Sequence, residues 1–171
     1  YLYYIAGGPR YVVFILFSTL VTWLMALLIE KTEINGNHKG ARKLLILGLI
    51  LNFGMLGIVK YTNFAVENIN ALLHLNLRGI QLLLPLGISF YTFQSSGYLL
   101  DVYWKRCKAE RHPLKYALFV SFFPQILQGP IGRYSRLADQ LYAEHRFEGN
   151  NIIRGFERIL WGFFKKMILA D

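Results

Sequence analysis

The stretch LLLPLGISFYTFQSSGYLL, residues 82–100, decides how this chain is interpreted. It has no charged residue over a length that can cross a membrane, yet it contains Pro85, Gly87, Gly97 and a run of hydroxyl and amide side chains. Backbone breakers and polar groups are tolerated at membrane depth only where they face protein or a water-filled cavity. The stretch therefore predicts a segment that lines the interior of a membrane protein.

The composition of the whole chain also indicates a membrane protein. Hydrophobic residues make up 54% of the sequence and charged residues 17%. Residues 11–29 are uncharged and would form a helix about 28 Å long, which matches the hydrocarbon core of a bilayer. Residues 44–59 form a shorter run, which Lys60 can extend to the interface. Three glycines in this run predict close contact between helices: Gly48, Gly54 and Gly57.

Four membrane spans are predicted in all, over residues 11–29, 44–59, 80–104 and 116–128. The third span is expected to break near Pro85 and Gly87, and the fourth to be a short helix followed by irregular backbone. The pattern also predicts an interfacial amphipathic helix over 63–77 and an amphipathic segment over 152–170. The predicted fold class is an all-α integral membrane bundle with broken helices, in a single membrane domain over residues 1–171.

The formal net charge of +9 arises mainly in the segments between these spans. Loops 30–43 and 105–115 are rich in Lys and Arg, whereas residues 60–79 contain only Lys60 and Arg78. By the positive-inside rule, the two basic loops are predicted to be cytoplasmic, and residues 60–79 and Tyr1 external. Attraction to lipid headgroups explains the basic balance, so membrane lipids are predicted partners and nucleic acid is not.

Polar side chains in the opening stretch recur at steps of three and four, which form one stripe along a helix: Tyr91, Gln94, Ser95, Tyr98 and Asp101. The opposite face is expected to hold Phe93, Leu99 and Leu100. The stripe either lines a substrate tunnel or joins helices through hydrogen bonds worth about 0.6–2 kcal/mol each, and spacing alone favours the second interpretation. Asp101 is either an acid/base group or, preferably, the partner of Lys105 or Arg106 in a salt bridge.

A second polar constellation lies in FFPQILQGPIGRY, residues 122–134. Gln125 and Gln128 can share a helical face, and Arg133 can bind an anionic group such as phosphate. The alternative is a helix–loop corner with Arg133 as an interfacial anchor. If both constellations line a substrate tunnel, the candidate lining residues are Gln94, Ser95, Asp101, Gln125, Gln128 and Arg133.

The histidines and the single cysteine predict no metal site and no bound cofactor. All four histidines fall in predicted loops or interfacial segments: His38, His74, His112 and His145. None pairs with another His or with Cys107 at metal-ligand spacing.

Two motifs resemble the membrane-bound O-acyltransferase (MBOAT) family: LPLGISFYTFQSSGYLLDVYWKR at 84–106 and FVSFFPQILQGPIGRYSRLADQL at 119–141. The resemblance is to its bacterial branch of alginate O-acetyltransferases, polysaccharide and peptidoglycan acetylation proteins, and the teichoic-acid D-alanylation protein. Supporting matches are YYIAGGPRY at 3–11, NFGMLGIVKYTNF at 52–64 and GFFKKMILAD at 162–171. Order and spacing agree along nearly the whole chain.

The resemblance implies a multi-helix enzyme with a tunnel, which moves an acyl group from a cytoplasmic donor to a hydroxyl group. The donor would be acetyl-CoA or a carrier-bound acyl group, delivered by an acyl-carrier protein in the second case. The acceptor would be an exported polysaccharide or an extracytoplasmic acetylation partner. The family's histidine occurs in contexts such as R-R-W-H and L-W-H-G, which this sequence lacks. No catalytic residue is therefore assigned, and the chain is expected to be the inactive N-terminal part of a longer acyltransferase.

The leading hypothesis is O-acetylation of an exported cell-surface polysaccharide. One alternative is D-alanyl transfer to teichoic acid, with the basic loops as a docking surface for a carrier protein. Another is a transporter or flippase, because broken helices with polar stripes also build carrier sites. A purely scaffolding membrane module is a fourth interpretation, but it does not explain the polar stripe.

Overall fold

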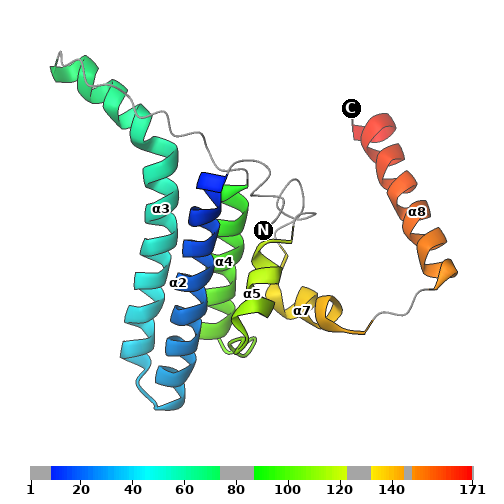
Figure 1. The fold of residues 1–171 in the computed structure, drawn as a ribbon, viewed down its shortest axis with the longest axis horizontal. Helices are drawn as coiled ribbons and strands as arrows, with labels where there is room; N and C mark the ends of the chain where they lie inside the picture. Colours follow the sequence, from blue (N-terminus) through cyan, green and yellow to red (C-terminus); the bar gives the residue numbers. More distant parts are fainter. Residues whose placement is uncertain (1–8, 74–86, 123–131, 145–147, 171) are drawn as a thin grey trace.

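Figure 1 shows a computed structural model of the chain, which describes residues 9–73, 87–122, 132–144 and 148–170. The elements are α2 (Pro9–Ile34), α3 (His38–Leu73), α4 (Ile88–Tyr103), α5 (Pro113–Val120), α7 (Tyr134–Tyr142), α8 (Gly149–Phe164) and the π-helix η1 (Lys165–Ala170). Within these described ranges there are helices and no strand, so the all-α prediction is confirmed there.

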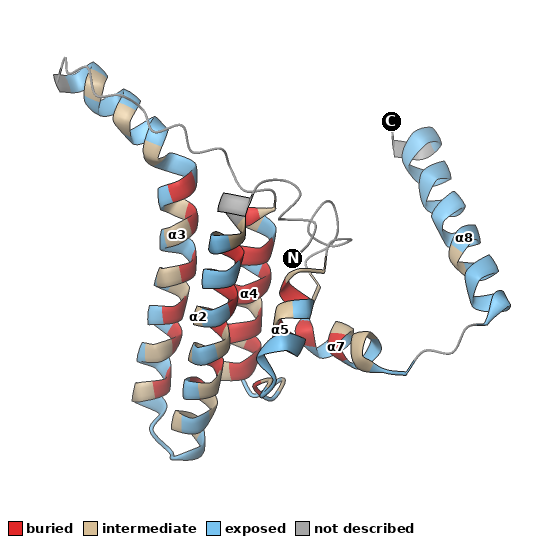
Figure 2. Ribbon diagram, viewed as in Figure 1, coloured by how far each residue is buried: buried red, intermediate tan, exposed pale blue. Residues whose placement is uncertain are grey.

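Helices α2, α3 and α4 pack side by side, and α5 and α7 continue the assembly beyond α4 (Figure 1). Buried apolar side chains from these five helices form the core, among them Ile15, Leu45, Leu99, Phe119 and Tyr134. Figure 2 shows buried residues along the faces that these helices turn toward one another. The core therefore consists of one stripe from each helix, as amphipathic packing requires.

The outer faces of α2 and α3 are apolar as well. Large hydrophobic side chains such as Val13, Leu20, Ile50 and Ile58 are exposed there. Both helices contain a segment long and apolar enough to cross a membrane, Val12–Ile34 and His38–Leu72. Exposed apolar surface on this scale is unfavourable in water and is relieved against lipid, which indicates a membrane protein.

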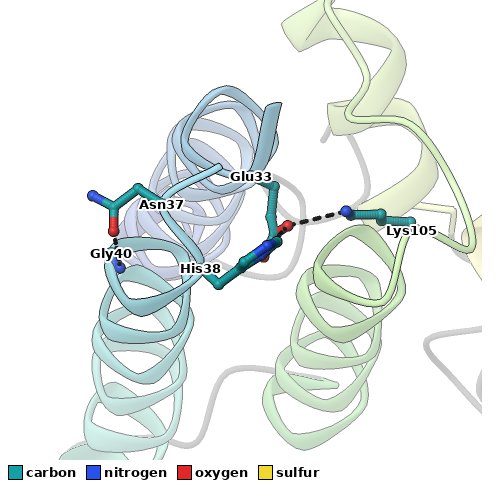
Figure 3. A network of polar contacts seen from close by, with 5 residues as sticks. All are labelled: Glu33, Asn37, His38, Gly40 and Lys105. Atoms are coloured by element: carbon teal, nitrogen blue, oxygen red, sulfur yellow. Dashed lines mark hydrogen bonds and ion pairs between the residues drawn. The ribbon is translucent and has the colours of Figure 1, made fainter. Parts of the chain in front are cut away.

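The turn between α2 and α3 is tied to the segment that follows α4 (Figure 3). The Asn37 side chain accepts a hydrogen bond from the backbone of Gly40 at 2.9 Å, which caps the start of α3. The Glu33 carboxylate lies 2.8 Å from His38 Nδ1 and 3.1 Å from Lys105 Nζ. Because Glu33 contacts both residues, the two basic loops meet at the same end of the bundle.

Helix α3 differs from the predicted division into a span and a separate amphipathic helix. It runs without interruption through residues 60–63, where the two were expected to meet. No Gly or Pro occurs between Val59 and Leu73, so nothing in the backbone stops the helix there. The sequence of α3 changes from apolar to mixed composition near Lys60, but the chain stays helical on both sides of that point.

The predicted break in the third span coincides with the start of α4. Gly87 has a φ of +74°, a left-handed conformation that favours glycine, and α4 begins at the next residue. Pro85 lies outside the described residues, and Gly97 lies within α4 without interrupting it. In the fourth predicted span, α5 ends at Val120, and residues 123–131 are not described.

Only one of the three glycines expected to allow close helix contact does so. A Cβ atom on Gly48 would lie 2.9 Å from Leu99 Cδ1 and 3.4 Å from Met25 Cβ. At Gly54 and Gly57 no described atom lies within 4 Å of such a Cβ, so the prediction is wrong for them. Gly54 and Gly57 lie six and nine residues beyond Gly48, so they face other directions around the helix.

Candidate functional site

The polar stripe of α4 faces the interior of the bundle, as its periodicity predicts. Its five residues are all buried: Tyr91, Gln94, Ser95, Tyr98 and Asp101. Phe93 is exposed on the other side. The expectation that Leu99 lies on that side is wrong, because Leu99 is fully buried toward α3. Helix α4 contacts both α2 and α3, so its buried arc is wider than the polar stripe.

Part of the stripe joins helices through hydrogen bonds. Tyr116 of α5 donates its hydroxyl to Ser95 Oγ at 3.3 Å, and Gln94 Nε2 donates to the Phe119 carbonyl at 3.3 Å. The Tyr98 ring lies against two other tyrosine rings, 4.7 Å from Tyr116 and 4.8 Å from Tyr134 between centroids. For Ser95, the hydrogen-bonding interpretation accounts for its position.

Glu110 joins three helices to the segment between α4 and α5. Its carboxylate accepts hydrogen bonds from the Tyr134 hydroxyl at 2.6 Å and from the His112 backbone at 2.9 Å. Its backbone N–H donates to the Tyr98 hydroxyl at 2.8 Å. Its carbonyl accepts from Trp23 Nε1, also at 2.8 Å. The segment is thereby fixed to α2, α4 and α7.

These contacts shift two pKa values. Burial alone would raise the pKa of Glu110, but the hydrogen bonds from Tyr134 and His112 outweigh it and hold that pKa below its usual 4.5. Burial, followed by the hydrogen bond to Glu110, raises the pKa of Tyr134. Glu110 is therefore an ionised acceptor at neutral pH and Tyr134 a protonated donor. The sequence analysis missed Glu110, whose one signal is that it is the sole acidic residue in loop 105–115.

Glu30, at the C-terminal part of α2, holds the same segment from the other side. Its carboxylate accepts a hydrogen bond from the Ala109 backbone at 3.0 Å and lies 3.8 Å from the Arg111 guanidinium. Cys107 is half-buried beside it, and burial, with smaller effects of Asp101 and Glu30, raises the pKa of its thiol to about 11. This thiol stays protonated at neutral pH and is a poor nucleophile.

A pocket of about 310 Å³ opens at the end of the stripe, between α4 and the start of α7. Three of the six candidate residues meet in its lining: Gln94, Asp101 and Arg133. The other lining residues are Gly97, Tyr98, Leu100, Trp104, Arg106 and Gly132. The two polar constellations, more than thirty residues apart in sequence at Gln94 and Arg133, thus form one site.

Asp101 and Arg106 interact within this pocket. Asp101 Oδ1 lies 3.6 Å from an Arg106 guanidinium nitrogen, which confirms the preferred salt bridge. The Arg106 guanidinium also lies over the Trp104 ring, 4.6 Å from its centroid. Arg133, which precedes the first residue of α7, has no ion pair among the described residues. With one carboxylate and two guanidinium groups, the pocket suits an anionic group.

The other three candidate residues are Ser95, Gln125 and Gln128, of which the structure describes Ser95. Ser95 is buried in the contact with α5 and is absent from the lining. Gln125 and Gln128 lie outside the described residues, so their predicted role stays a prediction.

A larger pocket, of about 620 Å³, lies between the end of α2 and the segment after α4. Its lining mixes the carboxylates of Glu30 and Glu33 with the cations of Lys105, Arg106 and Lys108. Because Glu33 already pairs with Lys105, the charges in this pocket largely serve the fold. Within the described ranges, no group of three His, Cys, Asp or Glu side chains could hold a metal ion.

The sequence analysis also passed over Asn52, which connects α2 and α3. Ser18 donates its hydroxyl to Asn52 Oδ1 at 2.7 Å, and Asn52 Nδ2 donates to Thr22 Oγ1 at 3.0 Å. The sequence signal for this contact was an amide within an otherwise apolar run, since polar side chains in such runs need partners. In the structure Asn52 is buried.

Comparisons with known proteins show that the chain is similar to O-acetyltransferases over most of its own length. It is 38% identical over 139 residues, 78% of its length, to the probable alginate O-acetylase AlgI of Pseudomonas syringae pv. tomato. It is 37% identical over 140 residues to the protein of that name from Pseudomonas aeruginosa. It is 33% identical to the peptidoglycan O-acetyltransferase of Helicobacter pylori in an alignment that covers 99% of the chain.

The matched region is a fraction of each relative. The chain spans 26% of the length of the two alginate O-acetylases and 36% of the peptidoglycan O-acetyltransferase. No family model and no solved structure matches the chain.

Proposed function

Because the chain is homologous along most of its length to alginate and peptidoglycan O-acetyltransferases, both of the MBOAT type, we propose that it is the N-terminal part of such an enzyme. The whole protein transfers an acetyl group to a hydroxyl of an exported cell-surface polysaccharide. This chain contributes one wall of the passage through which donor and acceptor groups meet.

The meeting of Gln94, Asp101 and Arg133 in one pocket is the observation that carries this proposal. Each was selected from the sequence as a tunnel residue, and two unrelated motifs supply them. A packing role alone would account for Ser95, but it does not explain why polar side chains from both motifs border one opening.

In this proposal the residues of this chain orient the acyl donor and neutralise its phosphate, and they take no part in the bond changes. Asp101 holds Arg106 near Trp104, so that Arg106 and Arg133 present two guanidinium groups to the pocket. Acetyl-CoA and a carrier-bound acetyl group both carry phosphate, which suits these groups. The general base for the acceptor hydroxyl is the histidine expected further along the protein, together with donors for the developing oxyanion.

The proposed location is the cell membrane, with several spans and with loops 30–43 and 105–115 on the cytoplasmic side. The contact between Glu33 and Lys105 supports this arrangement, because it brings both basic loops to one end of the bundle (Figure 3). A donor from the cytoplasm would then approach the end of α4 at which the pocket opens.

The test compares two arginines one helical turn apart, in the full-length protein expressed in a strain that lacks it. Arg133→Gln is expected to reduce the polysaccharide O-acetyl ester, measured by mass spectrometry, about 10-fold or more, because a charged hydrogen bond is worth about 1.5–3 kcal/mol. Arg136→Gln is the matched control, since Arg136 is exposed like Arg133 but does not line the pocket. Equal ester levels in both variants and the wild type, at equal protein levels, would contradict the proposal.

The same measurement identifies the acyl group. Loss of acetyl ester in the deletion strain supports the proposal, whereas loss of D-alanyl ester alone would replace it with D-alanyl transfer to teichoic acid. If no ester changes, the transporter interpretation takes its place.

A further inference from the structure

Helix α8 continues into η1, and none of residues 149–168, whose burial the structure describes, is buried. Figure 2 shows that α8 is almost entirely exposed and lies separate from the packed helices α2 to α5. Phe156 is 63% exposed and Leu160 67% exposed. Such a surface on a regular helix indicates that something other than the described residues covers its apolar face.

The apolar residues of α8 form one continuous face. At 100° per residue they fall within an arc of about 140°: Ile152, Ile153, Phe156, Ile159, Leu160, Phe163 and Phe164. The opposite side carries Arg154, Arg158 and Lys165 in one narrow stripe. If such a helix crossed the hydrocarbon core, its basic stripe would need protein partners, whereas in the membrane interface the stripe reaches water and headgroups without them.

The polar side is strongly basic. Residues 149–170 contain four cations and one carboxylate. Trp161 lies between the apolar face and the basic stripe, stacked 5.2 Å from the Phe164 ring and with Lys165 Nζ 5.5 Å from its centroid. Apolar residues on one side, basic residues on the other and a tryptophan between them are typical of helices that lie in the membrane interface.

We propose that α8 and η1 lie flat on an anionic membrane surface, with the apolar face in the acyl-chain boundary and the basic stripe among lipid phosphates. Charge favours this occupant, because anionic headgroups complement the basic stripe beside the apolar face, whereas α8 of a second copy offers only the same basic stripe. The candidate spans in α2 and α3 already bring the chain to a bilayer. The proposal does not depend on which acyl group the protein transfers.

The depth of two positions on α8 tests this directly. In the full-length protein with its native thiols replaced, Phe156→Cys marks the apolar face. Gly162→Cys marks the polar side, where no described atom lies within 4 Å of an added Cβ. Each is labelled with an environment-sensitive fluorophore in vesicles of phosphatidylcholine with phosphatidylglycerol. Quenching by shallow brominated acyl chains is expected at position 156, and quenching by aqueous iodide at position 162.

Two results would overturn the proposal. Protection of position 156 from both quenchers would show that protein covers the apolar face, either another part of the molecule or a second copy. Iodide quenching at both positions would show that α8 lies in water.

A charge variant tests the headgroup contact. In the parent protein, lipid quenching at position 156 is expected to be greater in anionic than in neutral vesicles. Replacing Arg154, Arg158 and Lys165 with Gln is expected to abolish this difference. The control replaces Lys39, Arg42 and Lys43, which are exposed on α3, and removes the same number of charges. Equal quenching of the parent protein in both kinds of vesicle would contradict a role for anionic headgroups.

Discussion

Glu110 shows how a single residue organises this site, since one side chain and its own backbone reach α2, α4 and α7. Its carboxylate has a depressed pKa in the folded protein, so it contributes stability above the pKa of the unfolded chain. That contribution is lost as the pH falls through the lower, folded pKa. Acidification should therefore release the segment between α4 and α5.

Glu110→Gln is expected to lower the free energy of unfolding by about 1–3 kcal/mol at pH 7, because a charged hydrogen-bond acceptor is lost. The difference from the wild type should narrow as the pH falls through the lowered pKa of Glu110, because the carboxyl group then becomes protonated. Thermal unfolding in detergent between pH 7 and pH 3.5 measures both effects. Glu144→Gln, at an exposed position, is the control and should leave stability unchanged. A Glu110→Gln protein as stable as the wild type at pH 7 would refute this role.

Single residues were predictable where their partners are close in sequence. The salt bridge of Asp101 with Arg106 spans five residues, so closeness in sequence was enough to suggest Lys105 or Arg106 as the partner. Glu110 and Asn52 were missed because their partners come from distant segments: Trp23 lies 87 residues from Glu110 and Ser18 lies 34 residues from Asn52. Such pairs depend on the packing of helices, which residue spacing does not reveal.

At the scale of elements, helices α2, α3 and α4 come close together at Gly48 of α3. Leu99 of α4 and Met25 of α2 both lie within reach of the Cβ that this glycine lacks. The contact keeps the polar stripe of α4 in register with its neighbours. Close approach of helix backbones at a small residue is a common device in membrane bundles.

Gly48→Ala is expected to destabilise the bundle by about 1–3 kcal/mol, because the fully buried Leu99 has to move. Gly54→Ala is the matched control on the same helix. With no described neighbour within 4 Å, it should be neutral or stabilise by up to about 1 kcal/mol through helix propensity. Denaturant titration of both variants in mixed micelles gives the comparison, and equal stability would show that the approach at Gly48 is not tight. Leu99→Val should recover part of the loss.

Element positions followed from hydrophobic runs and breakers, whereas element boundaries did not. A break was predicted near Pro85 and Gly87, but the sequence did not show that a helix begins directly after Gly87, whose backbone is left-handed. Helix α3 could not be predicted as one element, because the change of composition near Lys60 looks like a helix end. Whether a glycine touches a neighbour depends on which face it occupies, which separates Gly48 from Gly54 and Gly57.

For the whole molecule, the 171 residues alone are expected to show no acetyl transfer. The chain spans between a quarter and about a third of its relatives, and the family's histidine motifs are absent from it. The measurement is acetyl release from donor to polysaccharide by the purified segment in vesicles, with the full-length protein as positive control. Turnover by the segment above the rate in empty vesicles would contradict this expectation.

The general plan of the molecule could be predicted because burial of polar groups in apolar surroundings has few solutions. The inward orientation of the α4 stripe followed from that rule and from a period of 3.6 residues. The pocket did not follow, because it needs Arg133 of one motif to lie beside Gln94 and Asp101 of another. Contacts of the aromatic rings and of Glu110 set that proximity.

The central claim is that the polar stripe of α4 borders a water-accessible passage. The most direct measurement is labelling of Gln94→Cys and Phe93→Cys by a charged, membrane-impermeant thiol reagent, with Cys107 replaced by Ser, in the full-length protein in open membranes. Gln94 lines the pocket, and Phe93 is exposed on the apolar side of α4. We predict rapid labelling at position 94 and none at position 93, where lipid suppresses thiolate formation. Labelling at position 93 with protection at position 94 would contradict the account.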